Sequence, residues 1–348
     1  SKSLKIGDLE LKVPVVQGGM GVGISLSGLA GNVSACGGLG VISTAQIGWR
    51  EPDFYEKPFE ANFRAIEKEI KKARELAKGG VLGVNIMVAT QRYEEYVKSA
   101  VKAGIDIIIS GAGLPIDLPK YVEGSKTKIA PIVSSLKSLT VICRMWERKY
   151  QTAPDLVVIE GPKAGGHLGF SREELETVTD EAYDDVIVSI IEKVKEYSEK
   201  FSKKIPVVVA GGIYERKDME HVMKLGADGV QMGTRFVTTK ECDADEAYKQ
   251  SYIKAKKEDI KIVQSPVGMP GRAILNPFLE KVKTEKCKIK HCYQCIVTCD
   301  KKTIPYCITE ALVNAAEGRV DEGLLFCGEN AYRADKIETV AEIMEEFR

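Results

Sequence analysis

The sequence predicts an α/β fold, a (β/α)8 TIM barrel with a small C-terminal cysteine-rich helical extension, and three observations lead to this prediction. Short apolar runs alternate with helical patterns over roughly 250 residues, the usual size of such a barrel. The runs are rich in Val and Ile, as in strands that a parallel sheet buries on both faces. The glycine-rich turn at residues 17–23 lacks the G-x-G-x-x-G spacing of a dinucleotide-binding sheet, which disfavours that rival fold.

Each expected strand is a short apolar run bounded by glycine, proline or polar residues. In chain order the strands are expected at residues 13–16, 37–43, 80–88, 106–109, 129–133, 155–159, 206–210 and 228–232. We expect residues 1–280 to form the barrel domain, and residues 281–348 to form the cysteine-rich segment and the C-terminal helices.

Helices are expected between these strands, where apolar residues recur at helical spacing. Phe63, Ile66 and Ile70, for example, share one face of a charged segment. The loop at residues 47–57 follows no regular pattern. The expected helices are 25–36, 62–78, 93–103, 115–122, 138–150, 180–202, 216–225, 244–257 and, at the end of the chain, 335–347.

The composition limits the kind of partner. Lys plus Arg and Asp plus Glu both total 50 in 348 residues, so the formal net charge is zero and no basic tract predicts a nucleic-acid partner. No apolar run approaches the roughly 18 residues of a membrane helix. The first residues lack the apolar region of a secretory signal. We therefore expect a cytoplasmic protein that binds neither nucleic acid nor a membrane.

Glycine and small polar residues follow most of the predicted strands. In a barrel of this type the active site lies at the carboxyl ends of the strands, so these residues should meet on one face. Glycine there lets a ligand lie close to the backbone, because it has no Cβ. The strand ends include Gln17, Gly18, Gly19 and Met20, then Asn85, residues 110–113, residues 163–167, Gly211 with Gly212, and Gly233 with Thr234.

The last two strand ends predict a phosphate site. Phosphate groups in such barrels are frequently bound by the loops after the seventh and eighth strands. Either loop alone could be an ordinary tight turn, but the matched pair above a glycine-lined floor fits flavin mononucleotide (FMN). The loops carry Ala210, Gly211 and Gly212, and Gln231, Met232, Gly233 and Thr234.

His167 is the candidate catalytic residue. It is one of three histidines in the chain, and it lies in the glycine-rich stretch 160–169 that follows the sixth predicted strand. Histidine is the side chain most readily used for proton transfer near neutral pH. The alternative is a surface histidine in a tight turn.

Several ordered motifs resemble the nitronate monooxygenase family, also called 2-nitropropane dioxygenase-like, which includes the FMN-dependent enoyl-ACP reductases II. They are residues 14–21, Asn85, the stretch from Glu160 to His167, residues 209–213, residues 231–236 and residues 265–272. The resemblance covers about residues 10–280. It implies non-covalent FMN, a catalytic His167, and flavin contacts from Gln17, Gly18, Gly19, Met20, Gly21, Asn85, Glu160, Lys163, Gly165 and Gly166, with the flavin phosphate on the loops carrying Ala210 to Gly212 and Gln231 to Thr234.

The resemblance leaves the reaction open. Our first hypothesis is oxidation of nitronates or nitroalkanes, and the alternative is reduction of an enoyl thioester by NAD(P)H. A flavin-free phosphosugar-type barrel enzyme is an outside alternative. Arg272 is a candidate for holding an anionic substrate, or it forms a structural salt bridge. Small molecules or acyl thioesters are the expected substrates, an acyl carrier protein is a candidate partner, and a homodimer is a candidate assembly.

Five of the nine cysteines fall between Cys287 and Cys307. The spacing of Cys292, Cys295 and Cys299, with Cys307 or Cys287 as a fourth thiol, predicts a [4Fe–4S] cluster ahead of zinc. It is similar to the spacing in iron–sulfur flavoenzymes of the old-yellow-enzyme-like dienoyl-CoA reductase type. The alternative is a set of reduced structural cysteines.

Overall fold

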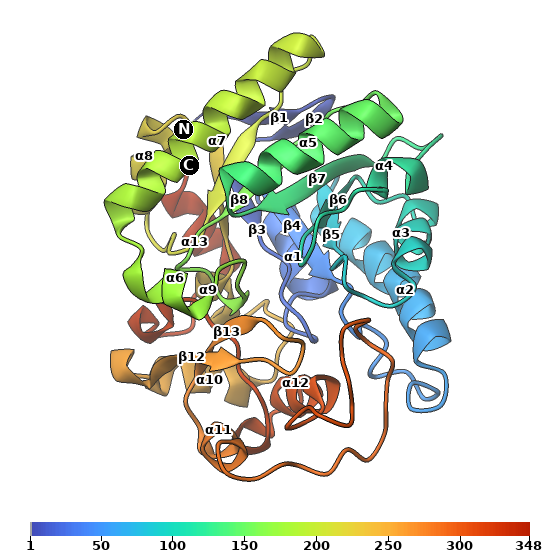
Figure 1. The fold of residues 1–348 in the computed structure, drawn as a ribbon, viewed down its shortest axis with the longest axis vertical. Coiled ribbons are helices and arrows are strands. Elements are labelled where there is room, and N and C mark those ends of the chain that lie inside the picture. The colour runs from blue at the N-terminus through green and yellow to red at the C-terminus, as the bar shows by residue number, and fades with distance from the viewer. Residues whose placement is uncertain (1) are drawn as a thin grey trace.

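The computed structural model describes residues 2–348 and contains a closed barrel of eight parallel strands (Figure 1). The ring closes because β11 pairs with β10 on one side and with β3 on the other. The predicted fold class is therefore confirmed, and every predicted strand has its counterpart. The strands are β3 (Val15–Gln17), β4 (Leu39–Ser43), β5 (Leu82–Asn85), β6 (Ile107–Ser110), β7 (Lys128–Val133), β8 (Val157–Glu160), β10 (Val207–Ala210) and β11 (Gly229–Met232).

Helices surround the barrel and pack apolar side chains against it (Figure 1). In α2, Ile66 and Ile70 are almost fully buried while the lysines face outward. In α5, Ser135 caps the first turn and Trp146 is fully buried. The helices of this ring are α1 (Ser27–Ala35), α2 (Pro58–Ala77), α3 (Tyr93–Lys102), α4 (Leu118–Tyr121), α5 (Leu136–Tyr150), α7 (Asp180–Lys200) and α8 (Arg216–Lys224).

A short hairpin that the sequence did not predict closes the amino-terminal end of the barrel. It consists of β1 (Leu4–Ile6) and β2 (Leu9–Leu11). Leu4, Ile6 and Leu11 are buried together with side chains from the barrel interior. With one end of the barrel closed in this way, the other end is the one that carries the cavity described below.

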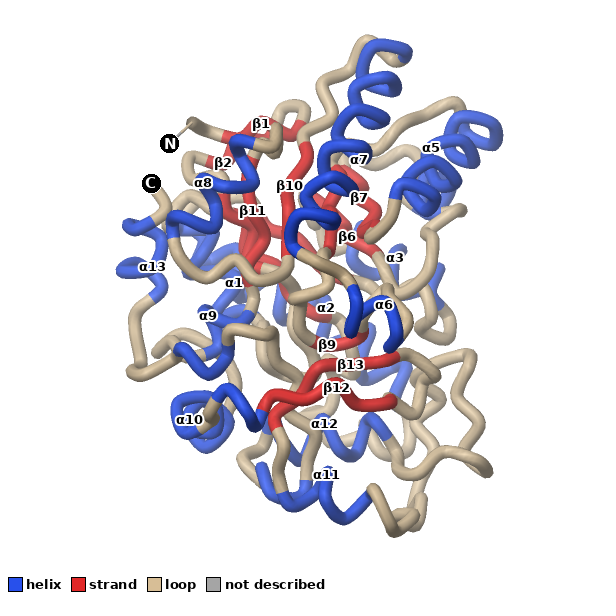
Figure 2. Tube along the Cα trace, turned by 60° about the vertical axis from the view of Figure 1, so that its left-hand side comes forward, coloured by secondary structure: helices blue, strands red, loops and turns tan. Residues whose placement is uncertain are grey.

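A second layer covers the carboxyl ends of the strands. Its centre is an antiparallel sheet of β12 (Ile260–Gln264), β13 (Pro270–Ile274) and β9 (Gly166–His167). This sheet lies below the barrel strands in Figure 2. The remaining elements of the chain are α6 (Arg172–Thr177), α9 (Thr234–Val237), α10 (Glu246–Lys254), α11 (Pro277–Val282), α12 (Ile308–Ala316), α13 (Val340–Glu346) and the 3-10 turns η1 (Lys257–Asp259), η2 (Val320–Glu322) and η3 (Ala331–Arg333).

The C-terminal helix returns to the barrel. Val340, Ile343, Met344 and Phe347 belong to the same hydrophobic core as the barrel helices. The helix begins at Val340, later than the predicted 335, because the Thr339 side chain accepts a hydrogen bond from the backbone N–H of Glu342 and caps the first turn. In residues 2–348, no helix combines the length and apolar character needed to cross a membrane.

Candidate active site

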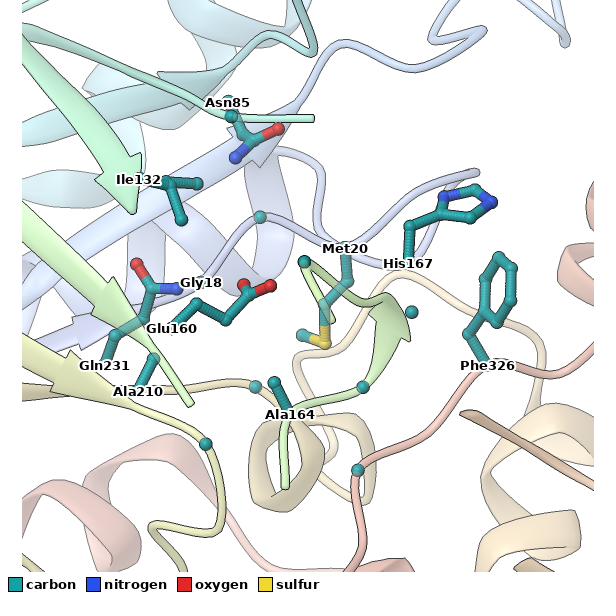
Figure 3. Close-up of a pocket in the computed structure, with 18 of the residues that line it drawn as sticks. Gly18, Met20, Asn85, Ile132, Glu160, Ala164, His167, Ala210, Gln231 and Phe326 are labelled. Carbon is teal, nitrogen blue, oxygen red and sulfur yellow. The ribbon is translucent and has the colours of Figure 1, made fainter. Parts of the chain in front are cut away.

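A cavity of about 490 Å³ lies between the barrel and the covering layer, at the carboxyl ends of the strands (Figure 3). The structure brings together at this cavity His167 and every predicted cofactor contact except Gln17. Residues that line it are Gly18, Gly19, Met20, Gly21, Asn85, Glu160, Lys163, Gly165, Gly166, His167, Ala210, Gly211, Gly212, Gln231, Met232, Gly233 and Thr234.

Gln17 is the candidate that stands behind the cavity wall. Its side chain is fully buried. Its amide nitrogen donates to the Val41 carbonyl at 3.1 Å, and its amide oxygen accepts from the Val41 N–H at 3.1 Å. Gln17 therefore ties β3 to β4 and fixes the start of the Gly18–Gly21 loop.

The two predicted phosphate loops lie side by side because β10 and β11 are neighbours in the barrel. Gly211 and Gly212 have φ values of +105° and +77°, which glycine adopts without strain. A Cβ on Gly212 would stand 2.9 Å from the Lys163 side chain, so the lysine stem packs directly on this loop. The Lys163 ammonium is 3.0 Å from an Asp180 carboxylate oxygen and 3.9 Å from one of Glu329. A cationic side chain thus stands beside the loop expected to bind phosphate.

His167 is held in the covering layer by backbone and side-chain contacts. In β9 it pairs with Gly271 of β13. Its Nε2 is 2.7 Å from the hydroxyl oxygen of Ser265, and its ring packs edge-on against Phe326 with ring centres 5.0 Å apart. Figure 3 shows the two rings together at one end of the cavity. Burial alone lowers the pKa of His167 to about 4, so the imidazole is neutral at physiological pH.

Glu160 ends β8 and its carboxyl group faces into the cavity (Figure 3). Burial raises the pKa of this carboxyl to about 7. Within residues 2–348 we find no hydrogen bond or ion pair from the carboxyl group. A half-buried carboxyl that opens onto the cavity and has no protein partner fits a polar ligand that hydrogen-bonds to it there.

Arg272 does not line the cavity. It is 7% exposed, and its guanidinium donates to the Pro162 carbonyl at 2.9 Å and also to the Ala164 carbonyl. Neither a salt bridge of Arg272 nor a contact with the cavity is present in the described part of the chain. The geometry gives Arg272 a place in supporting the loop that leads to His167.

Several residues of the cavity wall were missed by sequence reasoning. Residues 326–330 follow η2 and line the cavity, where the Glu329 N–H donates to the Lys163 carbonyl at 3.1 Å. The Asn330 side chain donates to the Gly212 carbonyl at 3.0 Å. No local sequence pattern marks residues 326–330, because they contact residues that lie more than a hundred positions away in the chain. Other wall residues that were missed are Ile132, Ser134, Tyr248, Tyr252, Met269 and Leu312.

The cysteine cluster expected from the spacing is not formed in this structure. Among residues 2–348, no group of three or more His, Cys, Asp or Glu side chains is arranged to hold a metal ion. Cys292, Cys295, Cys299 and Cys307 are free thiols. The backbone from Cys295 to Val297 instead pairs with residues 89–91 at the cavity wall. The pairing is a single antiparallel bridge, Ile296 with Thr90, and residues 297–298 turn directly after it.

Comparison with known proteins gives the family. A sequence model described as "Nitronate monooxygenase" matches residues 2–348. The chain belongs to the nitronate monooxygenase family. Membership confirms the resemblance seen in the motifs, and it makes the chain an enzyme, an FMN-dependent oxidoreductase.

Individual relatives carry two kinds of name. A "Probable nitronate monooxygenase" of Staphylococcus saprophyticus is 26% identical over 299 residues, 79% of each chain, and one of Staphylococcus haemolyticus is 25% identical over 311 residues. FabK from Thermotoga maritima is 26% identical, with a TM-score of 0.72 over 97% of this chain and 92% of that one. A nitroalkane oxidase from Streptomyces ansochromogenes shares the fold, with 20% identity and a TM-score of 0.68 over 97% and 94% of the two chains.

Proposed function

We propose that this member of the nitronate monooxygenase family is an FMN-dependent reductase that acts on the double bond of an enoyl thioester. The observation that carries the proposal is the setting of His167, a half-buried imidazole at the cavity whose one side-chain hydrogen bond within residues 2–348 is to Ser265 and whose lowered pKa keeps it neutral. FabK, an enoyl-ACP reductase II, is among the solved structures that the chain resembles. Enoyl thioester reduction was the alternative hypothesis from the sequence, and the setting of His167 favours it.

The residues at the cavity fit FMN. When bound, FMN supplies the hydride that reaches the β-carbon, after reduction by NADH or NADPH. The paired loops at Gly212 and Gly233 and the Lys163 ammonium would hold the phosphate, and Glu160 and Gln231 offer polar contacts to the rest of the cofactor. Glycine along the cavity floor leaves room for a flat ligand against the backbone.

His167 would polarise the thioester carbonyl. A neutral imidazole donates a hydrogen bond to a carbonyl oxygen, and such a donor stabilises the negative charge that develops there as hydride arrives. Phe326 and Met269 supply apolar surface at the cavity wall for an acyl chain. The α-carbon then takes its proton from solvent.

Nitronate oxidation, our first hypothesis from the sequence, is the second candidate, and the names of the curated relatives favour it. A nitronate is an anion, and no charged group contributes to the pKa of His167. A base with a pKa of about 4 is also poorly matched to removing the α-proton of a nitroalkane, because general bases work best near the operating pH. On these two grounds we put nitronate oxidation second.

The purified protein tests both candidates. We expect flavin absorbance, bleaching by NADH or NADPH without oxygen, and rapid return of the flavin absorbance when crotonyl thioester is added. Return with a nitronate and oxygen, and none with the thioester, would establish nitronate oxidation instead. A colourless protein that takes up no FMN would rule out both. An acyl carrier protein as donor of the thioester is tested in the same assay, by comparing crotonyl-carrier protein with crotonyl-CoA.

The role of His167 is tested by substitution. His167→Ala should retain FMN, because the imidazole is fixed by Ser265 and Phe326 in the covering layer. It should lower kcat by about 100-fold or more, the range seen when a single donor to a developing oxyanion is removed. Unchanged turnover would remove His167 from the mechanism.

A further inference from the structure

Ser265 is the one side chain that hydrogen-bonds to His167 in residues 2–348, and no role for it was predicted from the sequence. Its hydroxyl oxygen lies 2.7 Å from His167 Nε2, and the residue is only 2% exposed. A histidine in an active site can carry its proton on either ring nitrogen, and the hydrogen bond to one nitrogen decides which. The contact with Ser265 is therefore a place where the tautomer of His167 can be set.

The turn between β12 and β13 fixes the position of Ser265. The Ser265 N–H donates to the Met269 carbonyl at 2.9 Å, and the Gly268 N–H donates to the Ser265 carbonyl at 3.0 Å. Gly268 has a φ of +86°, a conformation that favours glycine. Pro266 adds a fixed φ next to the serine. The hydroxyl is thus placed by a rigid turn that is paired, through β13, with the strand of His167 itself.

The hydrogen bonds of the hydroxyl determine the direction of the proton. A hydroxyl has one hydrogen to donate and two lone pairs. The Val267 N–H donates to the Ser265 hydroxyl oxygen at 3.3 Å and uses one lone pair. His167 Nε2 is the one acceptor that the structure offers to the hydroxyl hydrogen in the described chain. Because a buried donor without an acceptor is unfavourable, the hydroxyl donates to Nε2.

We propose that Ser265 is a positioning residue that holds His167 in the tautomer with its proton on Nδ1. Nε2 is then an acceptor occupied by Ser265, and Nδ1–H is the donor left for a ligand in the cavity. Nδ1 has no hydrogen bond to any residue from 2 to 348. The tautomer itself does not depend on the proposed function. Only its consequence rests on that function, namely that the thioester carbonyl receives its hydrogen bond from Nδ1–H.

The tautomer is measured directly by nitrogen NMR of protein with 15N-labelled histidine, and His167→Gln assigns the resonances. In the wild-type protein we expect a protonated Nδ1 and an unprotonated Nε2 for His167. The opposite pattern would overturn the proposal. The measurement needs neither FMN nor turnover, so its outcome is separate from that of the enoyl reductase assay.

Substitution of the serine supplies the second readout. Ser265→Ala should give a mixture of tautomers and lower kcat at least tenfold with KM for the thioester unchanged, whereas Ser265→Thr, which keeps the hydroxyl, should restore both. Ser189→Ala on α7, away from the cavity, is the matched control and should change neither. A single Nδ1–H tautomer and full kcat in Ser265→Ala would reject a positioning role. If Ser265→Ala does not fold, the wild-type spectrum alone decides.

Discussion

The guanidinium of Arg235 donates to both carboxylate oxygens of Glu346, at 2.8 and 2.9 Å. It also donates to both carboxylate oxygens of Glu338, at 3.1 and 3.0 Å. Arg235 lies in α9, next to Thr234 of the predicted phosphate loop, while Glu346 ends α13. The last helix of the chain is therefore tied by paired charges to the loop expected to bind the FMN phosphate.

Arg235→Ala tests this connection. Arg235 is about 10% exposed, and removing one partner of a buried ion pair leaves the two carboxylates uncompensated. We expect the free energy of unfolding to fall by about 3 kcal/mol and the protein to release FMN more readily. Chemical denaturation and flavin retention on a desalting column measure the two effects. Arg319→Ala, which removes an exposed pair with Glu317, should change stability by about 0.5 kcal/mol or less.

Arg272→Met separates a supporting role from a substrate contact. The substitution leaves the carbonyls of Pro162 and Ala164 without their donor, at about 1–3 kcal/mol for each buried group. We expect a lower melting temperature and weaker flavin retention, with KM for the thioester within about twofold of wild type. Arg172→Met, on the exposed side of the same covering layer, is the control. A raised KM at unchanged melting temperature would instead establish the substrate contact that the sequence suggested.

The raised pKa of Glu160 predicts an unusual pH dependence for the stability of the flavin-free protein. Its pKa is about 7 in the folded state against an ordinary 4.5, so between these values the folded chain holds a proton that the unfolded chain has released. The free energy of unfolding therefore falls as pH rises from about 4.5 to 7, by about 3 kcal/mol for this group. Glu160→Gln should remove that part of the slope in urea denaturation across this range. An equal slope in wild type and Glu160→Gln would show that the carboxyl ionises normally.

The barrel could be predicted because its strands are local signals. Runs such as Val207–Ala210 are buried on both faces, so their Val-rich composition alone marks them. In a parallel barrel the carboxyl ends of all strands lie on one face, so the residues after the predicted strands could be identified as the cavity floor. Ser265 and Phe326 could not be found in this way, because each reaches His167 only through pairing between distant segments.

Charge and spacing were weaker guides than strand composition. Arg272 looked like a ligand for an anion, but its burial against two carbonyls depends on the path of the loop from Gly161 to Gly166, which no local pattern encodes. The cysteine spacing suggested a compact metal loop. In the fold, the segment makes one bridge to the barrel loop, between Ile296 and Thr90, and no three of its thiols are arranged to hold a metal ion in the described chain.

The cysteine segment supplies the last prediction. Within the described chain no three of its thiols are arranged to hold a metal ion, and the segment pairs through its backbone with residues 89–91. We therefore expect anaerobically purified protein to contain far less than one iron per chain. The triple variant Cys292→Ser, Cys295→Ser, Cys299→Ser should keep the wild-type flavin spectrum and melting temperature, as should Cys36→Ser, the control outside the segment. Stoichiometric iron that is lost in the triple variant and kept in Cys36→Ser would show that a cluster draws the thiols together, against the arrangement found here.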